Sequence, residues 1–263
     1  MSIKTTLTNN HLQNNGRCID FAGYQLPVWF TNQKDEHLAV RNKVGMFDIS
    51  HMGLIEISGT GADDFLSTLN LKKINQYLNK NLHKFDVVIV IDYGHGFINQ
   101  KIYKTLLKKS RFLAINCQTN SANLGFNLIT KYKKCDYVCI DEPELRLASS
   151  NKYDEIIKIL KDNLSKKIKC KNFTITRGRK GSTSYLKSKI LQTPALISEK
   201  VLDTIGAGDV FLVITSLLYA TKANQLVTNL VGNIAGALKV DILGHSKSIN
   251  KSDLYSVLKH ILK

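Results

Sequence analysis

DTIGAGDVF, residues 203–211, is the stretch of this chain that decides its fold, and the apolar run LVITSLLYA follows it at once. A glycine-rich turn that leads into a helix directs several backbone N–H groups at one point, where the positive end of the helix dipole also lies. The stretch therefore predicts an anion-binding turn. Asp209 lies within that turn, and a carboxylate beside bound phosphates is best explained as a base that accepts a proton from an attacking hydroxyl. The alternative is a helix N-cap, a position that Asp favours.

The same nine residues closely resemble the DTxGAGDxF signature of the ribokinase (PfkB-type) carbohydrate kinases. The resemblance implies phosphoryl transfer with Asp209 as the catalytic base. It implies that the backbone of Gly206, Ala207 and Gly208 forms the anion hole. It also implies ATP and Mg²⁺ as cofactors and a sugar or sugar phosphate as the acceptor.

Residues 70–263 alternate apolar strands with helical stretches. FDVVIVIDYG, residues 85–94, is a continuous β-branched run typical of a parallel sheet buried on both faces. The alternation predicts an α/β fold, namely a ribokinase-like, doubly wound and mostly parallel sheet, whose ligands gather at the carboxyl ends of the strands. Further strands are expected at 112–117, 135–141 and 171–178, a hairpin at 181–196, and helices at 71–82, 99–110, 142–168, 224–243 and 253–262.

Polar residues follow two of the expected strands. Asp92 and His95 follow the first, where they either face the site or serve as a capping Asp and a surface His. Asp141 and Glu144 follow another, and two carboxylates suit Mg²⁺ and its water ligands. The kinase family has Asn-x-x-Glu here, so Glu144 matches and is assigned to Mg²⁺ through water, whereas Asp141 departs. Without the resemblance, the pair would be helix-start carboxylates favoured by the helix dipole.

The stretch ITRGRKGS, residues 175–182, resembles the TxGxxG turn that borders the nucleotide in these kinases. The resemblance assigns Thr176 and Gly178 to the nucleotide, and Arg177 and Lys180 add positive charge there. It also places Asn233 on a helix that flanks the adenine. The alternative for Asn233 is an ordinary packed helix.

The segment FLAINCQTNSANLGFN, residues 112–127, departs from the usual kinase pattern. Its residues Gln118, Asn120 and Asn123 indicate a polar loop with no assigned ligand. The tripeptide Asp92-Tyr93-Gly94, placed directly after a strand, resembles the heptose-phosphate kinase type.

Residues 1–69 read as a small α+β fragment. The strings DFAGYQLPVWF, EHLAVRNKVGMFDISHMG and ISGTGADDFLSTL within them resemble the N-terminus of the glycine cleavage T protein, the folate-dependent aminomethyltransferase. The resemblance covers residues 7–69, and the catalytic aspartate of that family lies beyond the point where this chain departs. We therefore expect no aminomethyl transfer. His51, on an alternating strand, is expected to be a packed, hydrogen-bonded residue.

Composition indicates a globular chain with net charge +16. Residues 1–69 carry five basic and seven acidic side chains, so the positive excess lies in residues 70–263. Its lysines are scattered without aromatic residues between them, which favours a solvated surface over nucleic-acid binding. The chain has no apolar run of membrane-spanning length and no signal-peptide pattern at its start, so we expect a cytoplasmic protein that binds no membrane. The five cysteines lack paired metal spacing and are expected to be buried free thiols.

The two resemblances predict two fused parts. Residues 1–69 form an aminomethyltransferase-like fragment, and residues 70–263 form the C-terminal part of a kinase with its nucleotide site. The early glycine pair, the sugar-holding asparagine and the β lid of a ribokinase-type enzyme are not found, so the sheet is expected to be incomplete and phosphoryl transfer impaired. An exposed sheet edge would favour a homodimer. The alternatives are a nucleotide-binding remnant without turnover and, ranked last, a folate-binding protein.

Overall fold

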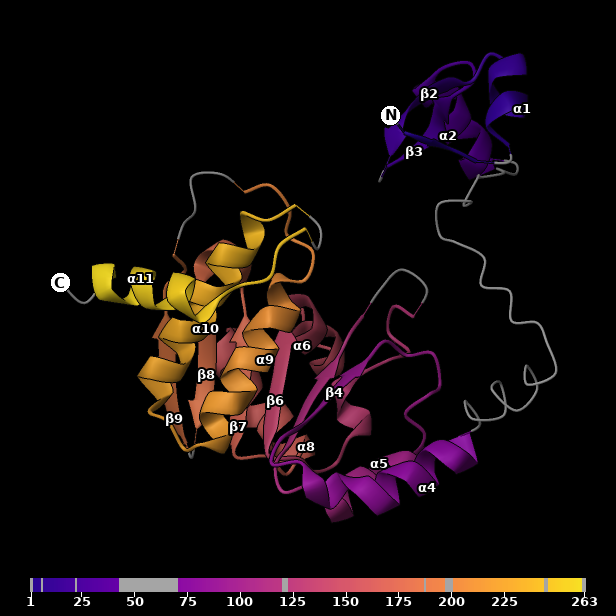
Figure 1. Ribbon diagram of the computed structural model, residues 1–263. Helices are drawn as coiled ribbons and strands as arrows, with labels where there is room; N and C mark the ends of the chain where they lie inside the picture. Colours follow the sequence, from indigo (N-terminus) through magenta and orange to yellow (C-terminus); the bar gives the residue numbers. More distant parts are fainter. Residues whose placement is uncertain are drawn as a thin grey trace. The chain divides into compact units, whose positions relative to one another are not determined.

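The computed structural model describes residues 2–5, 7–21, 23–42, 71–119, 123–186, 188–196, 201–243 and 246–261. Contacts divide the chain into two compact units, Met1–Leu66 and Ser67–Lys263. Each unit is described by itself (Figure 1). The alternating strand expected around His51 lies outside the described residues.

The first unit contains a three-stranded sheet of order β1-β3-β2. A left-handed glycine, Gly23 with φ +85°, makes the tight turn of the β2–β3 hairpin. Among the described residues of this unit few side chains are buried, Leu26 and Thr8 among them. The unit is therefore a small α+β fold, as the sequence predicts. Its elements are β1 (Ile3–Lys4), α1 (Thr8–Gln13), β2 (Arg17–Phe21), β3 (Tyr24–Trp29) and α2 (Gln33–Asn42).

The second unit is built on a six-stranded sheet of order β4-β5-β6-β7-β8-β9. The first four strands are parallel, and the last two add antiparallel pairs. The mostly parallel sheet expected from the apolar runs is confirmed. Within the described residues, β4 pairs with β5 alone and forms one edge of the sheet. The strands are β4 (Val88–Asp92), β5 (Leu113–Cys117), β6 (Tyr137–Asp141), β7 (Asn172–Thr176), β8 (Ser182–Leu186) and β9 (Lys189–Thr193).

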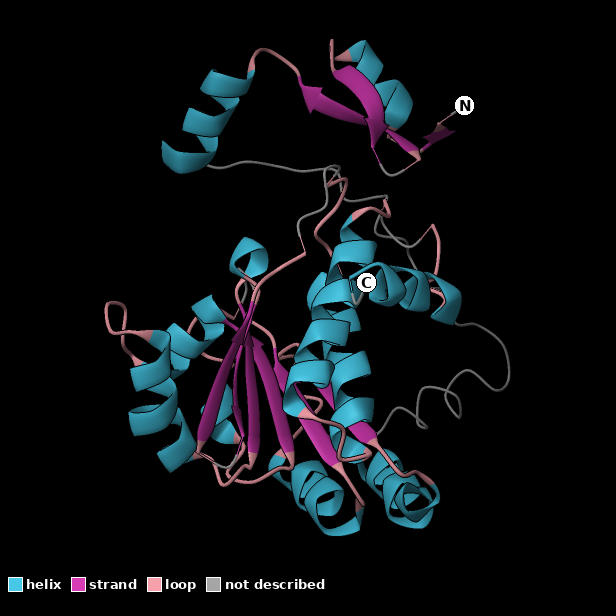
Figure 2. Cartoon of the chain, turned by 90° about the vertical axis from the view of Figure 1, so that its left-hand side faces the viewer, coloured by secondary structure: helices cyan, strands magenta, loops and turns pink. Residues whose placement is uncertain are grey.

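Helices cover both faces of this sheet (Figure 2). The helices are α4 (Leu71–Asn81), α5 (Gln100–Lys109), α6 (Glu142–Ser149), α7 (Ile156–Ile159), α8 (Ser165–Lys167), α9 (Ala207–Ala220), α10 (Gln225–Val240) and α11 (Lys251–Ile261). Single helical turns lie at η2 (Leu82–Lys84), η3 (Ile129–Lys131), η4 (Leu160–Leu164) and η5 (Gly178–Lys180), of which η4 is a π turn.

Neighbouring residues of β6 belong to two different hydrophobic clusters. Val138 lies in a large cluster with residues of α5, α6 and α7, whereas Tyr137 and Cys139 lie in a cluster with residues of α9. Successive side chains of a strand point to opposite faces, so these clusters mark the two sides of the sheet. The strand is thus buried on both faces, as its continuous apolar sequence requires.

Helix α9 is held against β6 by specific contacts as well as by burial. The hydroxyl oxygens of Tyr137 and Thr215 are 2.8 Å apart, and the rings of Tyr137 and Tyr219 pack with their centroids 4.7 Å apart. Leu212 is buried on the same side, and full burial of such a side chain contributes about 1.5–3 kcal/mol. These contacts fix the start of α9 beside the carboxyl ends of the parallel strands.

The remaining predicted features are the long helical segment after β6 and the five cysteines. The segment expected to be helical over 142–168 is divided at Ser150, whose backbone is left-handed (φ 52°), into α6 and the later α7, η4 and α8. All five cysteines are free thiols, as expected, but the expectation that they are all buried is wrong for two of them: Cys117, Cys135 and Cys139 are buried, whereas Cys18 and Cys170 are half-buried.

Candidate functional site

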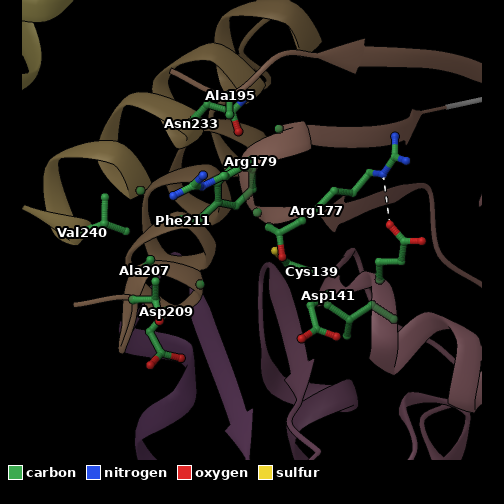
Figure 3. A pocket seen from close by; sticks show the side chains of 18 of the residues that line it. Cys139, Asp141, Arg177, Arg179, Ala195, Ala207, Asp209, Phe211, Asn233 and Val240 are labelled. Atoms are coloured by element: carbon green, nitrogen blue, oxygen red, sulfur yellow. Dashed lines mark hydrogen bonds and ion pairs between the residues drawn. The ribbon is translucent and has the colours of Figure 1, made fainter. Parts of the chain in front are cut away.

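A cavity of about 1270 Å³ lies at the carboxyl ends of the parallel strands. The ends of β6 and β7, the η5 turn, the start of α9 and one face of α10 surround it (Figure 3). This is the edge of the sheet at which the sequence predicts a ligand site. The predicted site residues that line it are Glu144, Thr176, Gly178, Gly206, Ala207, Gly208, Asp209 and Asn233.

The glycine-rich turn before α9 has the geometry that its sequence predicts. Gly206 is the N-cap residue and adopts the left-handed conformation (φ 79°, ψ 0°), which glycine reaches without strain. The turn is fixed from outside, because the backbone N–H groups of Leu202 and Asp203 donate to the carbonyl of Val240 at 2.8 and 3.1 Å. The last turn of α10 therefore sets the position of the start of α9.

The first turn of α9 presents backbone donors to the cavity. The N–H of Ala207 points back to the carbonyl of Thr204 at 3.3 Å, and the first bond of the helical ladder runs from Val210 N–H to Gly206 at 3.0 Å. Between them, helix geometry leaves the N–H groups of Gly208 and Asp209 without an acceptor inside the helix. These two donors, at the positive end of the helix dipole, can bind an anion.

The carboxylate of Asp209 lies in the same first turn and borders the cavity (Figure 3). Its negative charge, with a smaller effect of burial, raises the pKa of Tyr93, which lines the cavity from the end of β4. The same charge is one of several causes that raise the pKa of Glu144. Asp209 therefore faces the other polar residues of the cavity rather than bulk solvent alone.

Asp141 and Glu144 form a reciprocal capping box at the start of α6. The Asp141 side chain accepts from the Glu144 N–H at 2.7 Å, and the Glu144 side chain accepts from the Asp141 N–H at 2.9 Å. The second oxygen of Glu144 accepts from the N–H of Thr119 at 2.9 Å. Glu144 is 7% exposed, and burial, reinforced by the negative charge of Asp141, raises its pKa to about 7. This carboxylate ties the end of β5 to the start of α6.

The carboxylates that border the cavity bear on whether it can hold Mg²⁺. Within the described residues, no three His, Cys, Asp or Glu side chains are grouped closely enough to hold a metal by themselves. Asp141, Glu144 and Asp209 nevertheless border one cavity. Mg²⁺ commonly keeps several waters and uses one or two carboxylates with the phosphates of a substrate, and this donor set fits that mode.

The η5 turn closes the cavity between β7 and β8. Thr176 is the last residue of β7 and pairs with Asp141 of β6, and Gly178 is left-handed (φ 53°). Gly181 ends the turn with φ 80°, and an added Cβ there would lie 2.0 Å from the carbonyl oxygen of Thr193. The turn is therefore held tightly in place, with Thr176 and Gly178 at the cavity wall.

The two cations that the sequence places at this turn, Arg177 and Lys180, line the cavity, and so does Arg179. Arg177 donates to Glu142 at 3.3 Å and extends toward it, so its charge is compensated (Figure 3). Arg179, to which the sequence pattern gave no role, extends toward α9 (Figure 3). Lys180 lines the cavity beside it. The sequence contained the signal, three cations among four consecutive residues, but their directions depend on the backbone of η5.

Asn233 lies on α10 and is 8% exposed. Its side-chain NH₂ donates to the carbonyl of Pro194 at 2.9 Å and to that of Thr193 at 3.3 Å, so it ties α10 to the end of β9. The residue before it, Gly232, allows close helix packing, because an added Cβ would lie 2.6 Å from Thr215. Asn233 thus lines the cavity and is a packed residue, as the second interpretation of the sequence has it, whereas its place beside an adenine stays a prediction.

The structure does not bring Asp92 or His95 into the lining of the cavity. Asp92 is 3% exposed and is bonded by Lys131, the hydroxyl of Tyr132 and the N–H of Gly94. Burial acts to raise its pKa, but the bonds from Lys131 and Tyr132 outweigh it and hold the pKa below its ordinary value. Asp92 is therefore a buried structural carboxylate. Of the two interpretations of the sequence, the capping Asp with a surface His describes it better than a residue that faces the site.

The polar loop after β5 has a structural role in its described part. The NH₂ of Asn123 donates to the carbonyl of Tyr93 at 2.8 Å, and that of Asn127 donates to the carbonyls of Asp92 and Gln118 at 2.9 and 3.0 Å. These bonds hold the ends of β4 and β5 together. Asn120 lies outside the described residues. Gln118 lines the cavity, as do Tyr93 and Asn116, to which the sequence pattern gave no role there.

A family model, described as the GCVT N-terminal domain, matches residues 7–145, which is more than half of the chain. The chain belongs to this family. The GCVT N-terminal domain match extends well beyond residue 69, where the resemblance in the sequence ended, and includes β4, β5 and β6. An aminomethyltransferase from Alcanivorax borkumensis is 32% identical over 130 residues, which cover 48% of this chain and 34% of that protein. The chain thus spans about a third of the length of this curated relative.

Solved structures with a similar fold are sugar and nucleoside kinases. Arabidopsis thaliana ribokinase complexed with ribose and ATP has a TM-score of 0.57 at 16% identity, covering 69% of this chain and 58% of that one. Phosphofructokinase-2 from Escherichia coli in complex with potassium has a TM-score of 0.61 at 13% identity, covering 73% and 62%. Thermotoga maritima ribokinase has a TM-score of 0.55 at 19% identity, covering 73% and 61%.

At these identities the likeness shows the fold, which is ribokinase-like. Both resemblances noted in the sequence are therefore confirmed, that to the glycine cleavage T protein by family and that to the ribokinase-type kinases by fold. In the described part of the chain, no helix combines the length and the apolar character needed to cross a membrane.

Proposed function

We propose that this chain is an ATP-dependent carbohydrate kinase by descent, which transfers a phosphoryl group to a hydroxyl of a sugar or sugar phosphate. In this proposal residues 1–69 are the aminomethyltransferase-like fragment and residues 70–263 are the C-terminal part of the kinase. The observation that carries the proposal is the position of Asp209 in the first turn of α9, beside the N–H donors of an anion hole and facing one cavity.

The proposed reaction uses the side chains and amides of the cavity in defined roles. Asp209 accepts the proton of the acceptor hydroxyl, whose oxygen forms a bond to the γ-phosphorus of ATP. The bond from that phosphorus to the β,γ-bridging oxygen breaks, and ADP leaves with the electron pair. The turn at Gly206, Ala207 and Gly208, with the N–H groups that open onto the cavity, stabilises the negative charge on the transferred group.

The remaining predicted site residues position the donor. Thr176 and Gly178, at the wall of the cavity, border the phosphates, and Asn233 borders the base. Mg²⁺, held through water by Glu144, would offset the charge of the phosphates when bound. In this proposal the ligands are small molecules, and the scattered lysines of the unit form a solvated surface with no role for nucleic acid or membrane. The edge of the sheet at β4, which within the described residues pairs with β5 alone, favours a homodimer.

The test is release of ADP from Mg-ATP by the full chain, with a panel of sugars and sugar phosphates as acceptors. Asp209→Asn should lower acceptor-dependent turnover by about 10²-fold or more, because general base catalysis typically contributes 10²–10⁴-fold. The matched control is Asp162→Asn, since Asp162 is exposed on η4 and does not line the cavity. The proposal would be refuted if the rate of ADP release did not depend on the acceptor and were equal in wild type, Asp209→Asn and Asp162→Asn. ATP binding without any turnover would instead support a nucleotide-binding remnant.

The family match favours a second candidate function, an aminomethyltransferase-like protein that binds folate. The chain covers 34% of the curated relative, so we rank this function below the kinase. Tetrahydrofolate that raises the unfolding temperature while Mg-ATP does not would reverse that ranking.

A further inference from the structure

Two cysteines lie opposite each other just before β6 and β7 begin. A parallel bridge joins Lys134 to Lys169, and the same register continues in the two strands themselves. The next residue of each segment is a cysteine, so this register sets Cys135 opposite Cys170 on one face. The N–H of Cys135 donates to the carbonyl of Lys169 at 3.3 Å, which holds the two segments together at this point.

The two thiols are close enough to react with each other. They share a hydrogen bond, which together with burial raises the pKa of Cys135. Neighbouring strands lie about 4.8 Å apart, and a disulfide joins residues whose Cα atoms are about 4.4–6.8 Å apart. A bond between the sulfur atoms of Cys135 and Cys170 therefore fits the existing spacing of the strands.

The two thiols differ in their access to solvent. Cys135 is 5% exposed and belongs to the large hydrophobic cluster that includes residues of α5, α6 and α7. Cys170 is half-buried and packs against the same cluster, and its thiol donates to the carbonyl of Asn172 at 3.2 Å. A dissolved oxidant therefore meets Cys170 first, with the second thiol already beside it.

We propose that Cys135 and Cys170 form a site of reversible oxidation, at which hydrogen peroxide converts the two thiols into a disulfide that ties the start of β6 to the start of β7. The sulfur of Cys170 attacks the peroxide, so that an S–O bond forms, the O–O bond breaks, and the hydroxide that leaves takes up the thiol proton. The sulfur of Cys135 then loses its proton and attacks the sulfenic acid. An S–S bond forms, the S–O bond breaks and a second water leaves. Both sulfur atoms are oxidised, the peroxide is reduced, and a thiol reductant restores the pair.

This site is separate from the cavity, because neither cysteine lines it. The inference therefore does not rest on the proposed kinase function. The opposite ends of the same two strands carry Asp141 and Thr176, which pair with each other and border the cavity. The disulfide would thus hold together, from the far end, the two strands that carry part of the cavity wall. Because a cross-link restricts the unfolded chain, the oxidised protein should also be more stable.

The experiment treats the full chain with hydrogen peroxide and maps its disulfides by mass spectrometry of proteolytic fragments prepared without reductant. Two fragments joined through Cys135 and Cys170 should appear, and dithiothreitol should separate them. The unfolding temperature of the oxidised form should rise by about 5–10 °C. Cys170→Ser should show neither change. The matched control is Cys18→Ser, which should behave as wild type, because Cys18 is the other half-buried cysteine and lies in the first unit.

Two results would overturn the inference. The first is the absence of the joined fragments after treatment of the folded chain, whether Cys170 stays reduced, ends as a sulfinic acid or pairs with Cys18. The second is a joined form that unfolds at a lower temperature than the reduced protein, since the disulfide would then distort the strands instead of fitting their register.

Discussion

Glu144 offers a quantitative test of the site through the pH dependence of stability. Its pKa is raised from an ordinary value of 4.5 to about 7, first by burial and then by the charge of Asp141. A carboxyl with a raised pKa binds more protons in the folded than in the unfolded protein. The free energy of unfolding therefore falls as the pH rises between the two pKa values, from about 4.5 to about 7. Because a tenfold change in proton affinity corresponds to about 1.4 kcal/mol, the ionised carboxylate costs the folded protein roughly 3 kcal/mol above that range.

The perturbation is Glu144→Gln, which has nearly the same shape and stays uncharged. Near pH 5 the variant should be less stable than wild type by about 1–3 kcal/mol, because Gln has one carbonyl oxygen for the two N–H groups of Asp141 and Thr119. Between pH 5 and pH 8 this deficit should shrink or reverse by about 2–3 kcal/mol, since only wild type acquires a buried charge.

The assay is urea unfolding followed by circular dichroism at several pH values, with Glu155→Gln as the matched control. Glu155 is exposed and its side chain makes no capping bond at the start of α7. Stability curves of wild type and Glu144→Gln that run parallel from pH 5 to pH 8 would show that Glu144 does not titrate in this range, and the reasoning from its burial would be wrong.

Two further predictions concern the walls of the cavity. Gly181→Ala should lower the free energy of unfolding by about 2–4 kcal/mol, because Gly181 combines φ 80° with a Cβ position 2.0 Å from the Thr193 carbonyl. Gly178→Ala, with φ 53° and open space around its Cβ, should cost only about 1–2 kcal/mol in the same urea assay, and equal losses would contradict the steric argument. Tyr132→Phe should lower the free energy of unfolding by about 1–3 kcal/mol at pH 7, because buried Asp92 loses a hydroxyl donor. If Tyr132→Phe lowers the free energy of unfolding by the same amount in an Asp92→Asn background, the two side chains are not coupled and this reasoning is wrong.

The features that could be predicted from sequence are those set by local pattern. Continuous β-branched runs such as FDVVIVIDYG predict strands buried on both faces, and β4 lies within that run. The glycine-rich stretch before residue 207 predicts a turn that leads into a helix, and α9 begins there, after Gly206 in the left-handed conformation. Both follow from residues close to one another in the chain.

The features that escaped prediction depend on partners far along the chain. Asp92 is buried because Lys131 and Tyr132, about forty residues later, bond to its carboxylate. The asparagines after β5 bond to backbone carbonyls at the ends of two strands, which no spacing in the sequence reveals. Arg177 and Arg179 have the same chemistry, and only the backbone of η5 decides which of them faces α9.

The edge of the sheet at β4 has a consequence for how this chain can evolve. Within the described residues β4 pairs with β5 alone. The backbone N–H and C=O groups along its other side can therefore pair with another strand whatever side chains β4 carries. Substitutions in Val88–Asp92 that preserve the strand leave its ability to pair with a strand of another molecule unchanged. A charged side chain or a proline in β4, or a segment that covers its edge, would remove that ability. Selection against unwanted association therefore acts on the border of the sheet, at a place that takes no part in the proposed chemistry.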